Sequence, residues 1–245
     1  MSVRWQYPRI IAHRCGGALA PENTLAGMAV AARLGIRAVE FDVMLSADGV
    51  PLLIHDETLE RTTDGQGAVA AMPAAALLAL DAGVRHHRSF AGERIPTFRQ
   101  ALERCRELGL AANVEIKPAA GYEAETGRVV AETVRAFQAE CAAEGSSGAM
   151  LLFSSFSEAA LDAARIDASA PGAPARALLF ETVPDDWQAR LRRLDCEFLH
   201  CDAKRLRPER LAEIVAAGVA VACYTVNRRD QAEPLFAAGV TAIFS

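Results

Sequence analysis

Short apolar runs alternate along the chain with longer runs rich in Ala, Leu, Glu and Arg. The short runs have the length of buried strands and the longer runs that of helices. The predicted strands are Arg9–His13, Ala38–Val43, Pro51–His55, Asn113–Ile116, Met150–Ser154, Ala177–Phe180, Phe198–Cys201, Val219–Val226 and Ala242–Ser245. The predicted helices are Asn23–Leu34, Thr97–Glu107, Ala124–Ala143, Ser157–Ile166, Asp185–Leu194, Pro208–Ala217 and Arg229–Ala238.

Strands that alternate with helices in this way indicate parallel strands joined by crossover helices. The length of 245 residues is near that of one (β/α)8 barrel. No glycine-rich phosphate loop of the form GxGxxG or GxxxxGK[ST] follows a predicted strand, which argues against a nucleotide-binding fold. We therefore expect residues 1–245 to form a single α/β domain, a TIM-type barrel.

Nine predicted strands are one too many for that barrel. Only seven residues separate Val43 from Pro51, and they include the turn signal at residues 46–49. Because a parallel crossover needs about a dozen residues, we expect these two strands to form an antiparallel hairpin. The predicted pairs are Leu45 with Val50, Val43 with Leu52, and Glu40 with His55. This register would place Glu40, Asp42 and His55 on one surface.

The stretch from Glu57 to Glu93 interrupts the alternation of strands and helices. It is long and rich in Gly and Thr around residues 62–67. A connection of this length usually has a function or a fold of its own. We expect a small insertion, about residues 57–93, that packs over the C-terminal mouth of the barrel and restricts substrate size.

Composition narrows the possible partners. Apolar residues make up 51% of the chain and the net charge is −5, without the excess of Lys and Arg that is typical of nucleic-acid binders. No run approaches the roughly 20 apolar residues of a membrane span, and the first nine residues lack the apolar stretch of a signal peptide. We expect a cytoplasmic monomer or homodimer that does not bind nucleic acid and does not span a membrane. Six cysteines without metal-binding spacing are expected to be free thiols.

Charged and polar residues stand at the ends of four predicted strands. They are His13, Arg14, Glu40, Asp42, His55, Asp56, Glu115 and Lys117. The C-terminal strand ends of a TIM barrel form its active site. Residues two apart on a strand share a face, so Glu40 and Asp42 point the same way, as do Glu115 and Lys117. Charges inside strands are costly unless they are paired or metal-bound, which favours a functional site.

The types of these residues indicate metal-assisted chemistry at phosphorus. Carboxylates of Glu40, Asp42 and Glu115 are hard oxygen ligands that suit one divalent cation, Mg²⁺ or Ca²⁺. Arg14 and Lys117 are candidates for binding phosphate oxygens. The imidazoles of His13 and His55 remain for proton transfer, as base for an attacking hydroxyl and acid for a leaving alkoxide.

These residues stand in a series of motifs. In order they are His13–Arg14, Pro21–Glu22–Asn23–Thr24, Glu40–Phe41–Asp42–Val43, His55–Asp56, Arg61–Thr62–Thr63 with Gly65, Ile95–Pro96–Thr97 and Glu115–Ile116–Lys117–Pro118. In their order and spacing, the chain resembles the glycerophosphodiester phosphodiesterase family over nearly its whole length. The resemblance implies a barrel with an insertion after the His55 strand, Glu40, Asp42 and Glu115 as ligands of a divalent cation, and His13 and His55 as the acid–base pair.

Two positions depart from the family pattern. Cys15 replaces the usual Gly after His-Arg, and we expect it to be a packed residue rather than a reactive thiol. The sequence ends at Ser245, where relatives usually continue with an Asp and a Pro-containing turn. Outside the motifs, we expect His86 and His87 to be surface residues and His200 to be structural.

The predicted function is metal-dependent hydrolysis of small-molecule glycerophosphodiesters to sn-glycerol 3-phosphate and an alcohol. The alternative is a phosphodiesterase for lysophospholipids or another lipid phosphodiester, which would need an apolar surface at the mouth. A non-catalytic barrel would have lost part of the acid–base or ligand set, yet every member is present.

Overall fold

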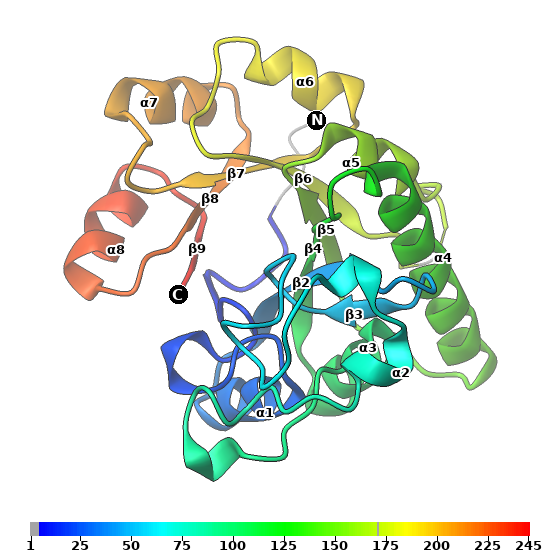
Figure 1. The fold of residues 1–245 in the computed structure, drawn as a ribbon. Coiled ribbons are helices and arrows are strands. Elements are labelled where there is room, and N and C mark those ends of the chain that lie inside the picture. The colour runs from blue at the N-terminus through cyan, green and yellow to red at the C-terminus, as the bar shows by residue number, and fades with distance from the viewer. Residues whose placement is uncertain (1–4, 171) are drawn as a thin grey trace.

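The chain folds as a barrel of parallel strands in a computed structural model that describes residues 5–170 and 172–245. The parallel strands are β1 (Ile10–Ile11), β2 (Ala38–Leu45), β4 (Ala111–Ile116), β5 (Leu151–Ser155), β6 (Ala175–Phe180), β7 (Phe198–Asp202), β8 (Ala220–Tyr224) and β9 (Ala242–Phe244). They pair in the order β1-β9-β8-β7-β6-β5-β4-β2. A parallel bridge between Ala12 and Val39 joins the β1 end of the sheet to β2. The sheet thereby curls on itself, and the predicted TIM-type barrel is confirmed (Figure 1).

Helices outside the strands connect each one to the next. They are α1 (Leu25–Arg33), α3 (Phe98–Leu108), α4 (Glu123–Ala143), α5 (Glu158–Ala163), α6 (Trp187–Arg193), α7 (Pro208–Ala216) and α8 (Arg229–Ala237). Sequence signals fix their ends. Thr97 and Gln100 form a capping box at the start of α3, and Gly109 ends it with φ of 63°. Among the described residues no helix is long and apolar enough to cross a bilayer.

The amino-terminal end of the barrel is filled by small and aromatic side chains. Four strands contribute alanines to one layer, namely Ala38, Ala111, Ala222 and Ala242. The rings of Trp5 and Tyr7 pack beneath this layer, and Trp5 lies 4.9 Å from Phe198 between ring centroids. Side chains therefore close this end, so the barrel interior can open only at the opposite, C-terminal end.

The surplus strand β3 (Pro51–Leu53) forms the predicted antiparallel hairpin with β2, but the predicted register is wrong by one residue. Val43 pairs with Leu53, and Leu45 with Pro51. The reason is the turn. Gly49 adopts φ of 76°, and the Ser46 amide donates to the Val50 carbonyl. A left-handed Gly here shortens the loop from four residues to three.

The register changes how His55 reaches the mouth of the barrel. The ladder between β2 and β3 ends at Leu53, so His55 is not paired with Glu40. His55 instead lies in the irregular segment that follows β3. The predicted pairing of Glu40 with His55 is therefore wrong, although Glu40, Asp42 and His55 still line one cavity, because the loop after β3 places the imidazole there.

Residues 57–93 carry a small hydrophobic cluster distinct from the main core. The segment contains η2 (Val69–Ala71), α2 (Ala74–Leu77) and η3 (Arg88–Phe90). The segment contributes Leu59, Val69, Leu77 and Ala82 to this cluster, which also includes Met44, Leu52 and Ile54 of the hairpin. In Figure 1 it runs from cyan to green beside β2 and β3. The hairpin thus anchors this segment to the barrel.

Candidate active site

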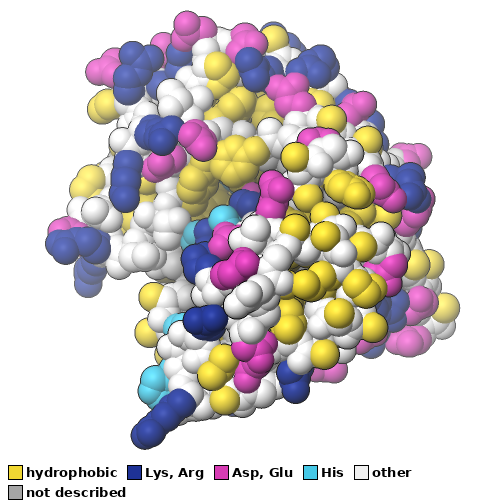
Figure 2. Space-filling view, viewed as in Figure 1, with side chains coloured by type: hydrophobic (Ala, Val, Ile, Leu, Met, Phe, Trp, Pro, Cys, Tyr) yellow, Lys and Arg dark blue, Asp and Glu magenta, His cyan; other side chains and the backbone are white. Residues whose placement is uncertain are grey.

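A cavity of about 360 Å³ opens among the C-terminal ends of the strands. All seven residues predicted for the site line it, namely His13, Arg14, Glu40, Asp42, His55, Glu115 and Lys117. Figure 2 shows a hollow with His and charged side chains gathered along one side and hydrophobic side chains on another. The structure therefore brings together side chains that lie more than 100 residues apart in the sequence.

The loop after β1 is held by Glu40. Arg14 and Cys15 adopt φ of 50° and 75°, which side chains rarely favour. The Arg14 amide donates to Glu40 Oε2 at 2.7 Å, and the Cys15 amide to the Glu40 carbonyl at 2.7 Å. These bonds stabilise the turn and leave His13 Nε2 3.8 Å from Glu40 Oε2. Cys15 is fully buried, and burial raises its thiol pKa, so it is the expected packed residue.

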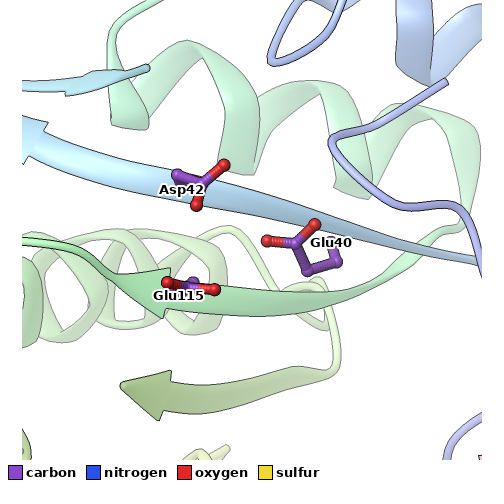
Figure 3. A group of neighbouring side chains, drawn as sticks. All are labelled: Glu40, Asp42 and Glu115. Atoms are coloured by element: carbon purple, nitrogen blue, oxygen red, sulfur yellow. The ribbon is translucent and has the colours of Figure 1, made fainter. Parts of the chain in front are cut away.

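Three carboxylates form the centre of the site. Glu40 and Asp42 lie on β2, and Glu115 lies beside Asp42 on β4 (Figure 3). One oxygen from each of the three lies within 4.8 Å of the others. Their residues are only 2%, 1% and 8% exposed. Burial and the neighbouring carboxylates raise the pKa of Glu115 to about 7 and that of Glu40 well above its ordinary value.

This cluster has the chemistry of a divalent cation site. Glu40 Oε1 is buried and has no hydrogen-bond partner, although a buried carboxylate oxygen left unpaired costs free energy. Lys117 Nζ lies 3.3 Å from Glu115 and 3.6 Å from Asp42, and Arg14 Nε lies 4.0 Å from Asp42, so two cations face three carboxylates. Mg²⁺ and Ca²⁺ prefer such hard oxygen ligands. The residues present therefore fit a divalent cation.

His55 is held at both ring nitrogens. Its Nδ1 lies 2.6 Å from Asp56 Oδ1, and its Nε2 lies 2.9 Å from Lys117 Nζ. Burial lowers the His55 pKa, which favours the neutral ring. Since the ammonium group can only donate, Nε2 accepts and Nδ1 carries the proton that is donated to Asp56. His55 Nε2 is therefore unprotonated and accepts from Lys117, another residue that lines the cavity.

A chain of ion pairs links the two sides of the loop region. Arg61 contacts Asp56 Oδ2 at 2.5 Å and Glu22 Oε2 at 2.7 Å. Glu22 Oε1 in turn accepts from Arg14 Nη1 at 2.9 Å. The Arg61 hydrogen bonds, opposed by partial burial, hold the Asp56 pKa well below its ordinary value. Asp56 is therefore ionised when it accepts from His55.

Sequence reasoning quoted Glu22, Asp56 and Arg61 within motifs but assigned them no role. Their positions are 5 to 39 residues apart, so no spacing rule links them. Asn23 was missed in the same way. Its amide nitrogen donates to Asp42 Oδ2 at 2.9 Å, and its oxygen accepts from the Asp42 backbone amide at 3.0 Å. These bonds fix the orientation of the Asp42 carboxylate.

The opposite wall of the cavity comes from β5 to β8 and has a different character. Phe156 packs edge-on against Tyr224, with ring centroids 5.9 Å apart. Beyond them Arg205 Nη1 contacts Glu181 Oε2 at 2.6 Å, with side chains 54% and 68% exposed. This wall therefore carries an aromatic pair and an exposed ion pair.

Comparison with known proteins identifies the group to which the chain belongs. Residues 13–245 match the model of the "Glycerophosphoryl diester phosphodiesterase family". A glycerophosphodiester phosphodiesterase from Caldanaerobacter subterraneus subsp. tengcongensis is 31% identical over 96% of this chain and 93% of its own.

Solved structures agree with that match. A phosphodiesterase from Oleispira antarctica, in complex with the product sn-glycerol-3-phosphate, is 39% identical, with a TM-score of 0.88 over 98% of this chain and 93% of its own. A glycerophosphodiester phosphodiesterase from Agrobacterium tumefaciens is 25% identical, with a TM-score of 0.73 over 96% and 95%. Together with the family match over residues 13–245, these similarities show that the chain belongs to the glycerophosphoryl diester phosphodiesterase family.

Proposed function

We propose that this protein hydrolyses glycerophosphodiesters to sn-glycerol 3-phosphate and an alcohol, using His13 and His55 as the acid–base pair and one divalent cation. The observation that carries the proposal is the meeting of two imidazoles, three carboxylates and two cations in one cavity. The 39% identical phosphodiesterase bound to sn-glycerol-3-phosphate supports the choice of substrate.

Glu40, Asp42 and Glu115 would hold the cation, Mg²⁺ or Ca²⁺. When bound, it would polarise a phosphoryl oxygen and offset the charge that develops in the transition state. Asn23 keeps the Asp42 carboxylate aimed into the cavity through its two hydrogen bonds. The cluster is thus oriented by neighbouring groups before a ligand arrives.

Proton transfer falls to the two histidines. We assign the base to His55, because its Nε2 carries no proton and lies beside Lys117, while Asp56 holds the opposite nitrogen. It removes the proton from the attacking hydroxyl, which is either water or the 2-hydroxyl of the glycerol moiety. Attack by the 2-hydroxyl gives a cyclic phosphate, and water must then open that ring in a second step to give sn-glycerol 3-phosphate. His13 then protonates the leaving alkoxide as the bond from phosphorus to that oxygen breaks. Burial lowers the His13 pKa to about 4 in the free site, so this role requires the ring to take up a proton when the anionic substrate binds.

Arg14 and Lys117 would bind the non-bridging phosphate oxygens. Arg14 Nε is buried without a hydrogen-bond partner, so it retains a donor for an incoming anion. Glu115 and Asp42 raise the Lys117 pKa against the opposing effect of burial, which keeps its ammonium group charged. Two fixed cations beside a metal are suited to a phosphodiester that carries one negative charge.

We also propose that residues 1–245 act as one barrel domain, with residues 57–93 as an insertion that restricts substrate size. Two features of that segment support the idea. It has its own hydrophobic cluster, and its Arg61 connects to His55 through Asp56. Lipid substrates with long acyl chains would then be slower than small diesters.

A turnover panel tests the proposed function. Glycerophosphocholine, glycerophosphoethanolamine and a lysophosphatidylcholine are incubated with the protein, and sn-glycerol 3-phosphate is measured. We expect release from the two small diesters, loss of activity with EDTA, and recovery with Mg²⁺ or Ca²⁺. Undiminished turnover after exhaustive chelation would exclude the metal, and exclusive turnover of the lysolipid would exclude the proposed substrate.

A further inference from the structure

The floor of the catalytic cavity contains buried polar atoms that the proposed reaction does not use. His200 on β7 is 0% exposed, and neither ring nitrogen has a hydrogen-bond partner. Asn113 on β4 is 4% exposed, and its Oδ1 also has no partner. Both residues line the same cavity as the carboxylate cluster. Two buried side chains thus present unused hydrogen-bonding atoms at one site.

Packing alone does not account for these residues. The His200 ring lies edge-on to Trp5 and Phe244, with centroids 6.3 and 5.0 Å away, contacts that a Phe would make equally well. Its strand neighbours in register are Leu179 and Ala222, which are apolar. A buried polar group without a partner costs free energy, so a polar partner is expected in the complete site.

The state of the two side chains defines what they can bind. Burial lowers the His200 pKa to about 3, so its ring is neutral, with one donor and one acceptor nitrogen. The Asn113 amide nitrogen already donates to Ser154 Oγ at 2.9 Å, which leaves Oδ1 as an acceptor. The floor therefore suits a small uncharged group that both donates and accepts, such as a hydroxyl.

Strand register gives the depth of this floor. Asn113 pairs with Glu40, and Glu115 pairs with Asp42, so Asn113 lies two residues nearer the closed end of the barrel than Glu115. Two residues along a strand correspond to about 6.6 Å. A phosphate bound near Lys117 would need a short chain to reach the floor, and a three-carbon glycerol carries its terminal hydroxyl at such a remove from phosphorus.

We propose that Asn113 and His200 bind the terminal hydroxyl of the glycerol moiety and so select glycerol diesters over diesters that lack it. The inference rests on the proposed function. It specifies that the glycerol end of the substrate lies at the floor of the cavity. The alcohol head group then lies at the open wall of Phe156 and Glu181.

The first experiment changes the substrate rather than the protein. Glycerophosphocholine is compared with 2-hydroxypropyl phosphocholine, which keeps the phosphate, the choline and the 2-hydroxyl but lacks the terminal hydroxyl. We expect kcat/KM to be about 10- to 100-fold higher for glycerophosphocholine, because the analogue leaves the floor groups unpaired. Equal values in the wild type would mean that the floor holds only water, and would overturn the proposal.

Two variants then locate the preference. His200→Phe keeps the ring contacts and removes the nitrogens, and Asn113→Leu removes the amide at similar volume. Each should reduce the preference for glycerophosphocholine to within about 3-fold of the analogue. Phe198→Leu is the matched control, because Phe198 lies two residues before His200 on β7 but does not line the cavity. It should retain the wild-type preference, and a loss there equal to that of His200→Phe would contradict the assignment.

Binding separates this inference from the proposed activity. Calorimetry compares sn-glycerol 3-phosphate with 2-hydroxypropyl phosphate on the wild-type protein, which requires no variant to fold. If neither choline diester is hydrolysed, the proposed function fails, but a 10-fold or greater preference for sn-glycerol 3-phosphate would still support the floor site. Equal affinities would overturn the floor site whether or not the enzyme is active.

Discussion

The two sides of the cavity mouth hold their charges differently. On the side of β1, β2 and β4, charged groups are largely buried, and His55 and Arg14 are each held by named partners. On the side of β5 to β8, the exposed Arg205 pairs with Glu181 and with Asp202, and Phe156 is 43% exposed. In the proposed reaction, the groups assigned to the reacting atoms are therefore held by neighbouring side chains before substrate binds, and we expect the more exposed opposite wall to accommodate different alcohols.

Removing one carboxylate should have the largest effect on the fixed side. We expect Glu40→Gln, Asp42→Asn and Glu115→Gln each to lower kcat by about 10³-fold or more, because loss of metal stabilisation is worth several kcal/mol. Calorimetric titration with Mg²⁺ or Ca²⁺ should show weaker binding in parallel. Full metal affinity in all three variants would place the cation elsewhere.

Removing either imidazole should have the next largest effect on kcat. His13→Ala and His55→Ala should each lower kcat by about 10²- to 10⁴-fold, the usual contribution of a general acid or base. KM should change less, because Arg14 and Lys117 remain to bind phosphate. The control is His86→Ala, a histidine on the exposed surface of the insertion. A His13 or His55 variant that turns over as fast as this control has no part in proton transfer.

The buried carboxylates should also make the metal-free protein sensitive to pH. Since the Glu115 pKa is raised to about 7, the folded state holds a proton that the unfolded state releases above about 4.5. The free energy of unfolding should therefore fall as pH rises from about 4.5 to 7, by up to about 3 kcal/mol from this group. The lowered pKa values of His13 and His55 act in the opposite direction.

Denaturant titrations of wild type and Glu115→Gln isolate that contribution. The difference between the two proteins should grow in favour of the variant as pH rises, and saturating Mg²⁺ should reverse it by stabilising the wild type. A difference that does not vary between pH 5 and 8 would mean that Glu115 titrates normally.

Arg61 tests whether the ion-pair chain positions His55. Arg61→Gln should lower kcat by about 10-fold with a small change in KM, because Asp56 loses its partner while every group near phosphorus remains. The pH profile of kcat should shift with the variant, and Arg61→Lys should recover part of the rate. Arg99→Gln removes a comparable pair of contacts, to Glu103 and Glu140, on the outside of α3. Equal losses in both variants would indicate general destabilisation.

The smallest effect on turnover is expected from substitutions on the β5 to β8 side of the cavity. Phe156→Ala should change KM by a few-fold, and by different factors for choline and ethanolamine head groups, because it removes ring surface from the alcohol side alone. Ratios of kcat/KM across the two diesters measure this. A loss of 10²-fold or more, equal for both, would show that this wall is as rigid and essential as the opposite one.

Strand positions were predictable from sequence, because buried strands and amphipathic helices differ in length and composition. The hairpin register was not, because it depends on whether Gly49 adopts the left-handed conformation. That choice decides if Pro51 or Val50 faces Leu45, and a shift of one residue reverses every side chain.

Site residues at strand ends were predictable for the same reason, because the barrel gathers those ends at one mouth. The roles of side chains from loops could not be predicted from the sequence. Arg61 can form its ion pairs only when the insertion folds beside Glu22 and Asp56. His200 was expected to be structural because no motif surrounds it, and the binding role proposed for it rests on the unpaired nitrogens, which only the structure shows.

All six cysteines are free and buried, so their labelling by a thiol reagent can measure how fast parts of the fold open. A thiol reagent cannot reach Cys15, which is 0% exposed within the loop after β1, until that part of the chain opens. Labelling rates would therefore read out opening events rather than surface chemistry. Mass spectrometry that resolves Cys15 from Cys201 and Cys223 on β7 and β8 would report whether the two halves of the barrel open together or in turn.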